Sequence, residues 1–124
     1  MTRITITIGG HELAAELNET ASAQAIAAAL PLRAQATRWG DEFYFAIPVE
    51  LAEATDAQAE VAVGDLAYWP PGNAFCIFFG PTPVSRGEEP RAYSPVNVVG
   101  RVLDDVAVLR TVASGAAVEL AVVA

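Results

Sequence analysis

Polar and apolar residues alternate strictly near the start of the chain, where threonines separate Ile4, Ile6 and Ile8. A period of two is typical of a strand with one buried face. Two glycines follow and predict a tight turn, so we expect residues 11–17 to form the return strand. A last apolar stretch predicts a further strand over residues 117–123.

Two segments carry helix signals. Thr20 is a suitable N-cap for residues 21–30, which are rich in alanine and end at a proline. Asp104 and Asp105 can cap a second, shorter helix over residues 106–113, which a Ser-Gly pair ends. We therefore expect two helices, one early and one late in the chain.

Residues 32–47 predict a hairpin whose loop is Gly40-Asp41. The turn sets a register that pairs Trp39 with Glu42, Thr37 with Tyr44, and Gln35 with Ala46. The other face of the hairpin is apolar except for one arginine, so we expect it to point inward. Its residues are Leu32, Ala34, Ala36, Arg38, Phe43, Phe45 and Ile47.

The next part of the chain mixes turn residues with short apolar runs. Residues 50–60 are acidic and rich in alanine, which predicts a surface loop. Gly64-Asp65 predicts a turn that joins strands at 61–63 and 66–69. Residues 74–79 are apolar at every position, as in a strand that is buried on both faces.

Residues 80–95 form the longest segment without a periodic pattern, and they hold four prolines and two glycines. Long loops in compact domains are usually functional or mobile. A strand over residues 96–103 follows, and Gly100 within it predicts a bend or a close approach of two backbones.

These elements amount to eight short strands and two helices, connected mainly by hairpins. Two helices cannot cover a large open sheet, whereas a closed barrel with a helix over each end leaves no free edge. The prediction is a mainly β fold, a closed, largely antiparallel eight-stranded barrel, in a single domain over residues 1–124.

Composition narrows the function classes. Fifteen acidic residues face seven basic ones, all arginines, and the formal net charge is −8. Such a surface repels phosphate, which argues against nucleic acid and anionic membranes as partners. The alternating N-terminus does not resemble a signal peptide, and no stretch is suited to a membrane helix. With a single cysteine, these features favour a soluble protein of the cytoplasm.

Three segments resemble the small bacterial and archaeal cyclophilin-like proteins of unknown function. They are GDLAYWPPGNAFCIFFGPTP at 64–83, WGDEFYF at 39–45 and SPVNVVGRV at 94–102. The resemblance extends from Ile4 to Val123 and is specific because the central segment is long and rich in aromatics, prolines and glycines. It implies a cyclophilin-type barrel of eight antiparallel strands capped by two helices.

The resemblance does not bring the enzyme activity with it. Typical prolyl isomerases present an arginine in a Phe-His-Arg context, a Gln-Gly-Gly segment and a tryptophan on a late loop, and this sequence has none of the three. A shared fold does not confer an activity. We expect a binding module without catalytic residues; a divergent isomerase that polarises a prolyl amide with Arg38 or Arg101 is the alternative, and assembly through an apolar face is a third.

The candidate ligand site is an aromatic cleft at the barrel rim that would hold a peptide or a small molecule. Arg38 is its polar anchor, because a desolvated arginine needs a partner. The competing interpretations are aromatics that fill the barrel, an arginine that reaches a nearby acid, and a loop that only closes the barrel. The candidate residues are Arg38, Glu42, Tyr44, Tyr68, Trp69, Phe79, Thr82 and Ser94.

Metal and cofactor chemistry find no support in the sequence. His11 is the only histidine, and the single cysteine, Cys76, lies in an apolar run. A His/Cys metal site and a histidine-based triad are therefore not expected, and no glycine-rich phosphate loop is present. Cys76 is expected to be an inert buried thiol. The sequence predicts neither a metal nor a cofactor and leaves the oligomeric state open.

Overall fold

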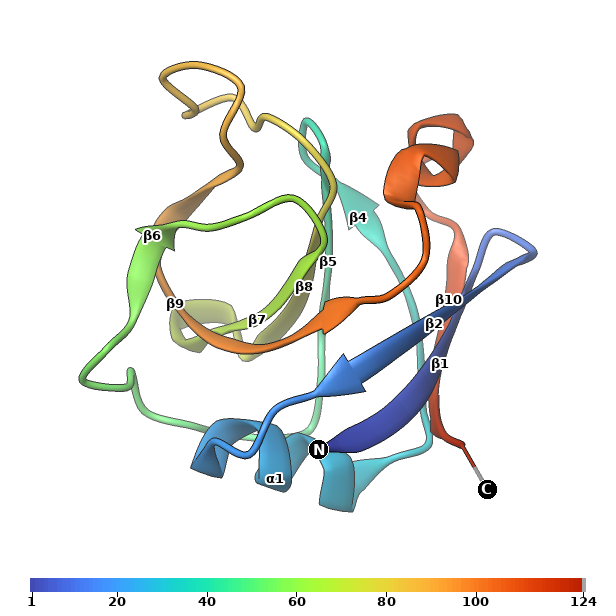
Figure 1. The fold of residues 1–124 in the computed structure, drawn as a ribbon, viewed down its shortest axis with the longest axis vertical. Helices are drawn as coiled ribbons and strands as arrows, with labels where there is room; N and C mark the ends of the chain where they lie inside the picture. The colour runs from blue at the N-terminus through green and yellow to red at the C-terminus, as the bar shows by residue number, and fades with distance from the viewer. Residues whose placement is uncertain (124) are drawn as a thin grey trace.

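A computed structural model describes residues 1–123, and Figure 1 shows a curled antiparallel sheet with short helices at its ends. The α-helix α1 covers Ala21–Ala29, and two 3-10 helices, η1 and η2, cover Pro70–Gly72 and Val106–Thr111. The strands are β1 (Thr2–Ile8), β2 (His11–Leu17), β3 (Leu32–Gln35), β4 (Thr37–Arg38), β5 (Glu42–Ala46), β6 (Gln58–Glu60), β7 (Asp65–Trp69), β8 (Ala74–Phe78), β9 (Arg91–Val102) and β10 (Ala117–Val122).

The strands pair in the order β3-β10-β1-β2-β9-β7-β8-β5-β4, and β6 pairs with β9 beside this path. Every pairing is antiparallel, as the sequence predicts, but the described residues hold ten strands where eight are expected. The two end strands, β3 and β4, are consecutive in the chain and only Ala36 separates them. The backbone therefore links the two end strands of the hydrogen-bonded path directly.

The difference in count comes from the predicted hairpin at 32–47. Its turn is confirmed, because Trp39 and Glu42 exchange backbone hydrogen bonds and Thr37 pairs with Tyr44. Gln35, however, pairs with Ala117 of β10 and not with Ala46. Ala36 marks the break, where its N–H donates to the carbonyl of Ala116. One predicted strand is thus divided between two partners.

Three further expectations differ from the structure. The predicted surface loop at 50–60 ends where β6 begins at Gln58, and the predicted strand at 61–63 is absent. The Gly64-Asp65 turn is present, and the Asp65 carboxylate accepts a hydrogen bond from the Ala62 N–H. The irregular segment after β8 ends at Pro90, and β9 begins at Arg91. Pro95 therefore lies inside a strand, in the stretch where the β6–β9 register shifts, so its missing N–H breaks no regular ladder.

The helices form for the reasons visible in the sequence. The Thr20 hydroxyl accepts a hydrogen bond from the Ala23 N–H at 3.2 Å, and α1 buries Ala23 and Ile26. Asp105 caps the second helical segment, which is a 3-10 helix that ends at Thr111. Figure 1 shows α1 and η2 at opposite ends of the curled sheet.

The main core lies inside the curl of the sheet. It includes the three isoleucines on the inward face of β1, and Phe43 and Phe45 on the inward face of β5. All five residues of β8 are buried, which confirms the prediction of a strand covered on both faces. Phe75 and Ile77 of β8 belong to this main core, whereas Cys76 and Phe78 point the other way.

A second, smaller cluster covers the outer face of β5, β7 and β8. Its buried members are Val61, Ala67, Cys76, Phe78, Ala92 and Val96. The first half of β9 and the segment around β6 lie over this face. The second cluster gives the outer face an apolar floor on which a pocket can form.

Further along the chain, β9 pairs with β2, and the two backbones approach closely at Gly100. A Cβ at this position would lie 2.1 Å from the Glu16 carbonyl oxygen, so the pairing requires glycine.

Candidate functional site

A pocket of about 230 Å³ opens on the outer face, next to the second cluster. Its floor is apolar and its walls are mostly aromatic. It lies on the outer face because Glu42 and Tyr44 alternate along β5 with the inward-facing Phe43 and Phe45. The lining residues are Trp39, Glu42, Tyr44, Trp69, Cys76, Ala92, Tyr93 and Val96.

Three aromatic rings surround the pocket, and two of them stand at steep angles to the third, Tyr93. The Tyr93 ring centroid lies 6.3 Å from that of Trp39, with an interplanar angle of 67°, and 6.3 Å from that of Trp69, with an angle of 88°. Tyr93 is 74% exposed, so it stands at the mouth of the pocket. Both pairs make edge-to-face contacts and are not stacked.

The Trp69 indole is fixed from two sides. Its Nε1–H donates to the Ser94 hydroxyl at 2.7 Å. Gly72 in η1 has no side chain, and a Cβ there would lie 2.7 Å from Trp69 Cζ3, so only glycine leaves room for the ring. The Pro-Pro-Gly turn after β7 and the hydroxyl from β9 together hold this wall in place.

Glu42 is the one acidic residue of the pocket lining, and it is only 5% exposed. Burial raises the pKa of its carboxyl from 4.5 to about 7, and the neighbouring Cys76 thiol opposes part of this rise. Across the pocket floor, burial and the nearby Glu42 raise the pKa of Cys76 well above its usual value. No arginine or amino terminus within residues 1–123 forms an ion pair with Glu42.

Arg38 lies outside the pocket lining, on the other face of the same hairpin. Its guanidinium donates to three backbone carbonyls at 2.9–3.1 Å and pairs with Asp41 at 3.0 Å. It also lies over the Phe79 ring, 5.2 Å from the centroid. The three carbonyls are those of Gly40, Arg110 and Val112, so the side chain joins the hairpin loop to the end of η2.

Tyr68 and Phe79, two further candidates, lie fully buried in the main core and do not line the pocket. The Tyr68 hydroxyl donates to the Val49 carbonyl at 2.6 Å and accepts from the Leu51 N–H at 3.1 Å. Phe79 stacks on Phe43 with ring centroids 5.4 Å apart. Both side chains therefore belong to the core behind the site.

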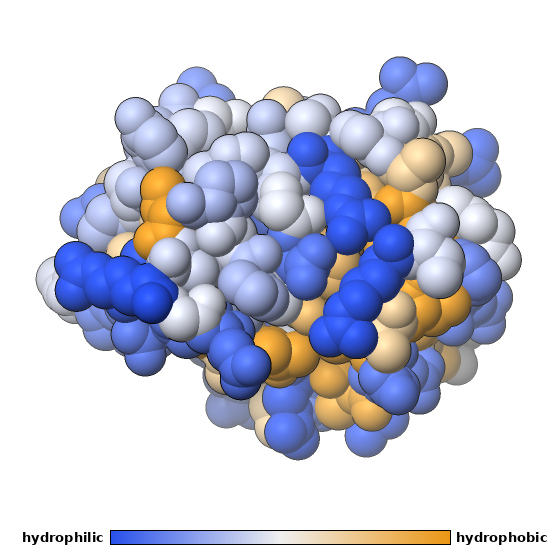
Figure 2. Space-filling view, turned by 90° about the horizontal axis from the view of Figure 1, so that it is seen from above, coloured by the Kyte–Doolittle hydropathy of each residue, from blue (hydrophilic) through white to orange (hydrophobic). Residues whose placement is uncertain are grey.

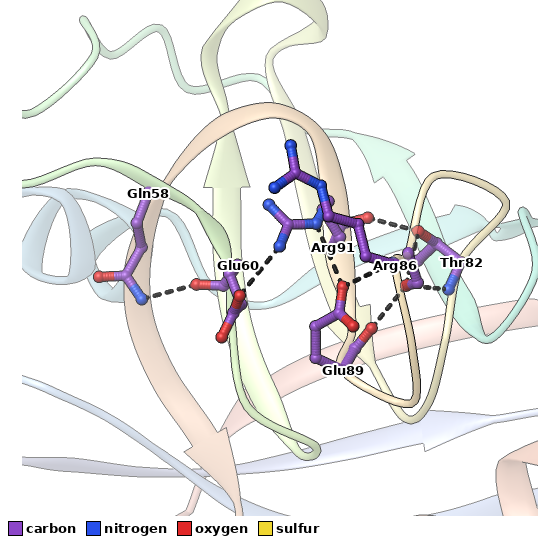
Figure 3. A network of polar contacts seen from close by, with 7 residues as sticks. Gln58, Glu60, Thr82, Arg86, Glu89 and Arg91 are labelled. Atoms are coloured by element: carbon purple, nitrogen blue, oxygen red, sulfur yellow. Dashed lines mark hydrogen bonds and ion pairs between the residues drawn. The ribbon is translucent and has the colours of Figure 1, made fainter.

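Thr82 belongs to a polar network that fastens the loop after β8 to the start of β9 (Figure 3). Its hydroxyl donates to the Arg91 carbonyl, and its N–H donates to the Ser85 hydroxyl at 2.9 Å. Arg91 in turn pairs with Glu60 at 2.9 Å and with Glu89 at 3.1 Å. Because Ala92 and Tyr93 come next in the chain, the network sets the position of one pocket wall.

Of the eight candidate residues, the structure brings Glu42, Tyr44 and Trp69 together in the pocket, with Ser94 behind the indole. Trp39 and Tyr93 were missed. The hairpin register already sets Trp39 on the face of Glu42 and Tyr44, which was a usable signal. Tyr93 carried none, because the prolines on either side of it predict a loop.

No group of three or more histidine, cysteine, aspartate or glutamate side chains that could hold a metal gathers within residues 1–123. In the same residues, no helix is long and apolar enough to cross a membrane.

Hydrophilic residues cover most of the end that carries the loop after β8 and η2, with hydrophobic residues in smaller areas between them (Figure 2).

Residues 2–121 match the Cyclophilin-like family model, so the chain belongs to that family. Among solved structures it is similar to the solution structure of the hypothetical protein AF2241 from Archaeoglobus fulgidus. The two share 40% identity and a TM-score of 0.81 over 97% of this chain and 93% of the other. No curated protein matches the chain.

Proposed function

We propose that this protein is a binding module that holds a small ligand, or a single side chain of a peptide, in the pocket between Trp39, Glu42, Trp69 and Tyr93. The observation that carries the proposal is an apolar, aromatic pocket with one buried carboxyl group in its lining, which is the usual composition of a ligand site. Its volume of about 230 Å³ lies below the range of roughly 300–1,000 Å³ typical of drug-sized ligands, which favours a small occupant.

The proposal also includes a closed barrel behind the pocket. Its support is that β3 and β4, the two ends of the hydrogen-bonded path, follow each other directly in the chain. A closed barrel resists deformation better than an open sheet, since it has no free edge strands. A rigid wall under β5, β7 and β8 would keep the aromatic rings preorganised for binding.

The alternative, a divergent prolyl isomerase, has less support. An isomerase of this kind would use an arginine to polarise the prolyl amide. The Arg38 guanidinium is occupied by three carbonyls and Asp41, and Arg101 pairs with Glu16 at 3.3 Å. Neither arginine lines the pocket. Binding without turnover therefore fits the side-chain geometry better.

A fragment screen tests the proposed function, with binding read from NMR shifts of the Trp39 and Trp69 indole N–H groups. We expect hits that shift these two signals and lose affinity by about tenfold in Tyr93→Ala. Val63→Ala is the matched control, because Val63 is also exposed but lies outside the pocket. Hits that shift neither indole signal, or that bind Tyr93→Ala with unchanged affinity, would refute the site. Turnover of proline peptides would favour the isomerase.

A further inference from the structure

The pocket combines a carboxyl group that has no cationic partner among residues 1–123 with three electron-rich ring systems, and this combination indicates a ligand class. We propose that the pocket selects a small organic cation with an alkylated ammonium head, which the Glu42 carboxylate neutralises while the rings of Trp39, Trp69 and Tyr93 surround it. The inference rests on the proposed function, because it names the chemistry of the ligand that the same pocket would bind.

The ring arrangement offers a cation several aromatic surfaces. The planes of Trp39 and Trp69 each make a steep angle with that of Tyr93, so Tyr93 is parallel to neither indole and forms no stacking pair with either of them. Rings in such different orientations can contact a roughly spherical ammonium group from different sides. Each contributes attraction through its negative face, and tryptophan is the strongest of the three aromatic residue types.

The carboxyl group supplies the charge complement. Glu42 is buried, and its cross-strand neighbour on β8 is the apolar Phe78. The arginine closest in sequence, Arg38, points to the other face of the hairpin and is held there by Asp41. A buried carboxylate is costly without a counterion, so a cationic ligand gains more at this position than a neutral one. The net charge of −8 would also draw cations toward the protein.

The other titratable groups around Glu42 do not supply a competing charge. Cys76 on β8 keeps its proton, because burial raises the pKa of the thiol. The other two polar side chains of the lining, Tyr44 on β5 and Tyr93 on β9, are phenols and not carboxylic acids or amines. Asp41, next in the chain, is engaged by Arg38. Glu42 is thus the pocket group whose charge changes between pH 6 and 8, since its pKa is about 7.

The test compares choline with 3,3-dimethylbutan-1-ol, a neutral molecule of nearly the same shape, by calorimetric or NMR titration of the full chain. At pH 8 we expect choline to bind about tenfold more tightly than the neutral analogue. The preference should weaken at pH 6, where more of the Glu42 population is protonated. Because choline itself carries a fixed charge, any such pH dependence comes from the protein.

Glu42→Gln is the decisive variant, because it removes the charge and keeps the shape of the side chain. It should bind choline and the neutral analogue equally and without the change between pH 6 and 8. Glu12→Gln, at an exposed position outside the pocket, is the matched control and should behave like the native protein. An amide of trimethyl-lysine serves as a second cation, and tighter binding than choline would identify a peptide side chain as the source of the ammonium group.

Three results would overturn the inference: equal or tighter binding of the neutral analogue to the native protein, choline binding that survives Glu42→Gln, or no choline binding at all. In each case the fragment screen decides whether the proposed function still holds. Neutral hits that shift the two indole signals would support a binding module and refute only its selectivity for cations. A screen without such hits would refute both the binding module and the selectivity.

Discussion

Arg38 and Glu42 lie four residues apart on one hairpin, and their surroundings differ completely. Arg38 faces the main core and the end of η2, and protein groups occupy its guanidinium on several sides. Glu42 faces the outer pocket, is more deeply buried than the partly exposed Arg38, and has no cationic partner among residues 1–123. A charged group that the protein satisfies itself stabilises the fold, whereas one left unsatisfied beside a pocket is available to a ligand.

The largest expected effect is the loss of stability in Arg38→Ala. The substitution leaves three carbonyls and Asp41 without their donor and removes the contact with Phe79. We expect the free energy of unfolding to fall by about 3 kcal/mol, measured by urea denaturation. Arg33→Ala is the control, since Arg33 is 83% exposed in its ion pair with Glu119 and should cost less than about 1 kcal/mol. Equal losses in the two variants would contradict a structural role for Arg38.

A smaller effect, opposite in sign, is expected for Glu42→Gln. The folded-state pKa of Glu42, about 7, lies above the ordinary value of 4.5, so the folded protein binds the proton more tightly than the unfolded chain. The native protein therefore loses stability as the pH rises from about 4.5 to 7, by roughly 2–3 kcal/mol from this group. Glu42→Gln removes that loss.

The measurement is the difference in unfolding free energy between Glu42→Gln and the native protein at several pH values. The variant should be more stable at pH 8, and its advantage should disappear near pH 4.5. Glu12→Gln, at an exposed position, should show no such trend. A Glu42→Gln variant that is less stable at pH 8 than at pH 4.5, relative to the native protein, would show that the carboxylate is stabilised in the fold.

The smallest effect is expected at the Trp69 indole, which forms one wall of the pocket. Ser94→Ala removes the acceptor of the Trp69 indole N–H. We expect a stability loss of about 1 kcal/mol and a red-shifted tryptophan emission, because the indole then turns toward water. Ser22→Ala, which removes a hydrogen bond from Asn97, is a control that should leave the emission unchanged. An unaltered emission spectrum in Ser94→Ala would mean that packing against Gly72 alone fixes the ring.

Local patterns were sufficient to predict much of the fold. The alternation of Ile4, Ile6 and Ile8, the cap at Thr20 and the uniformly apolar β8 each depend on neighbours close in sequence, and all three predictions are confirmed. The register of Gln35 could not be predicted in the same way. Its partner, Ala117, lies more than eighty residues further along the chain, and a hairpin turn carries no information about it.

The site was harder to predict than the fold, for a related reason. The face with Trp39, Glu42 and Tyr44 follows from the turn, but the pattern alone suggests that this face is solvated. It becomes a pocket only because β9 begins at Arg91 and lays Ala92 and Tyr93 over it. In the sequence, Arg38 stands out as a charged residue on an apolar face. The buried carboxyl of the pocket belongs instead to Glu42, whose burial depends on these distant segments.

The most direct measurement is an NMR titration of the Glu42 side-chain carboxyl carbon in the native protein, with assignment by Glu42→Gln. A buried, unpaired carboxyl facing the pocket should titrate with a pKa of about 7, and saturating choline should lower that value, because a bound cation favours the carboxylate. A carboxyl that titrates near 4.5, with or without choline, would show that Glu42 is neither isolated from solvent nor available as the counterion of a ligand.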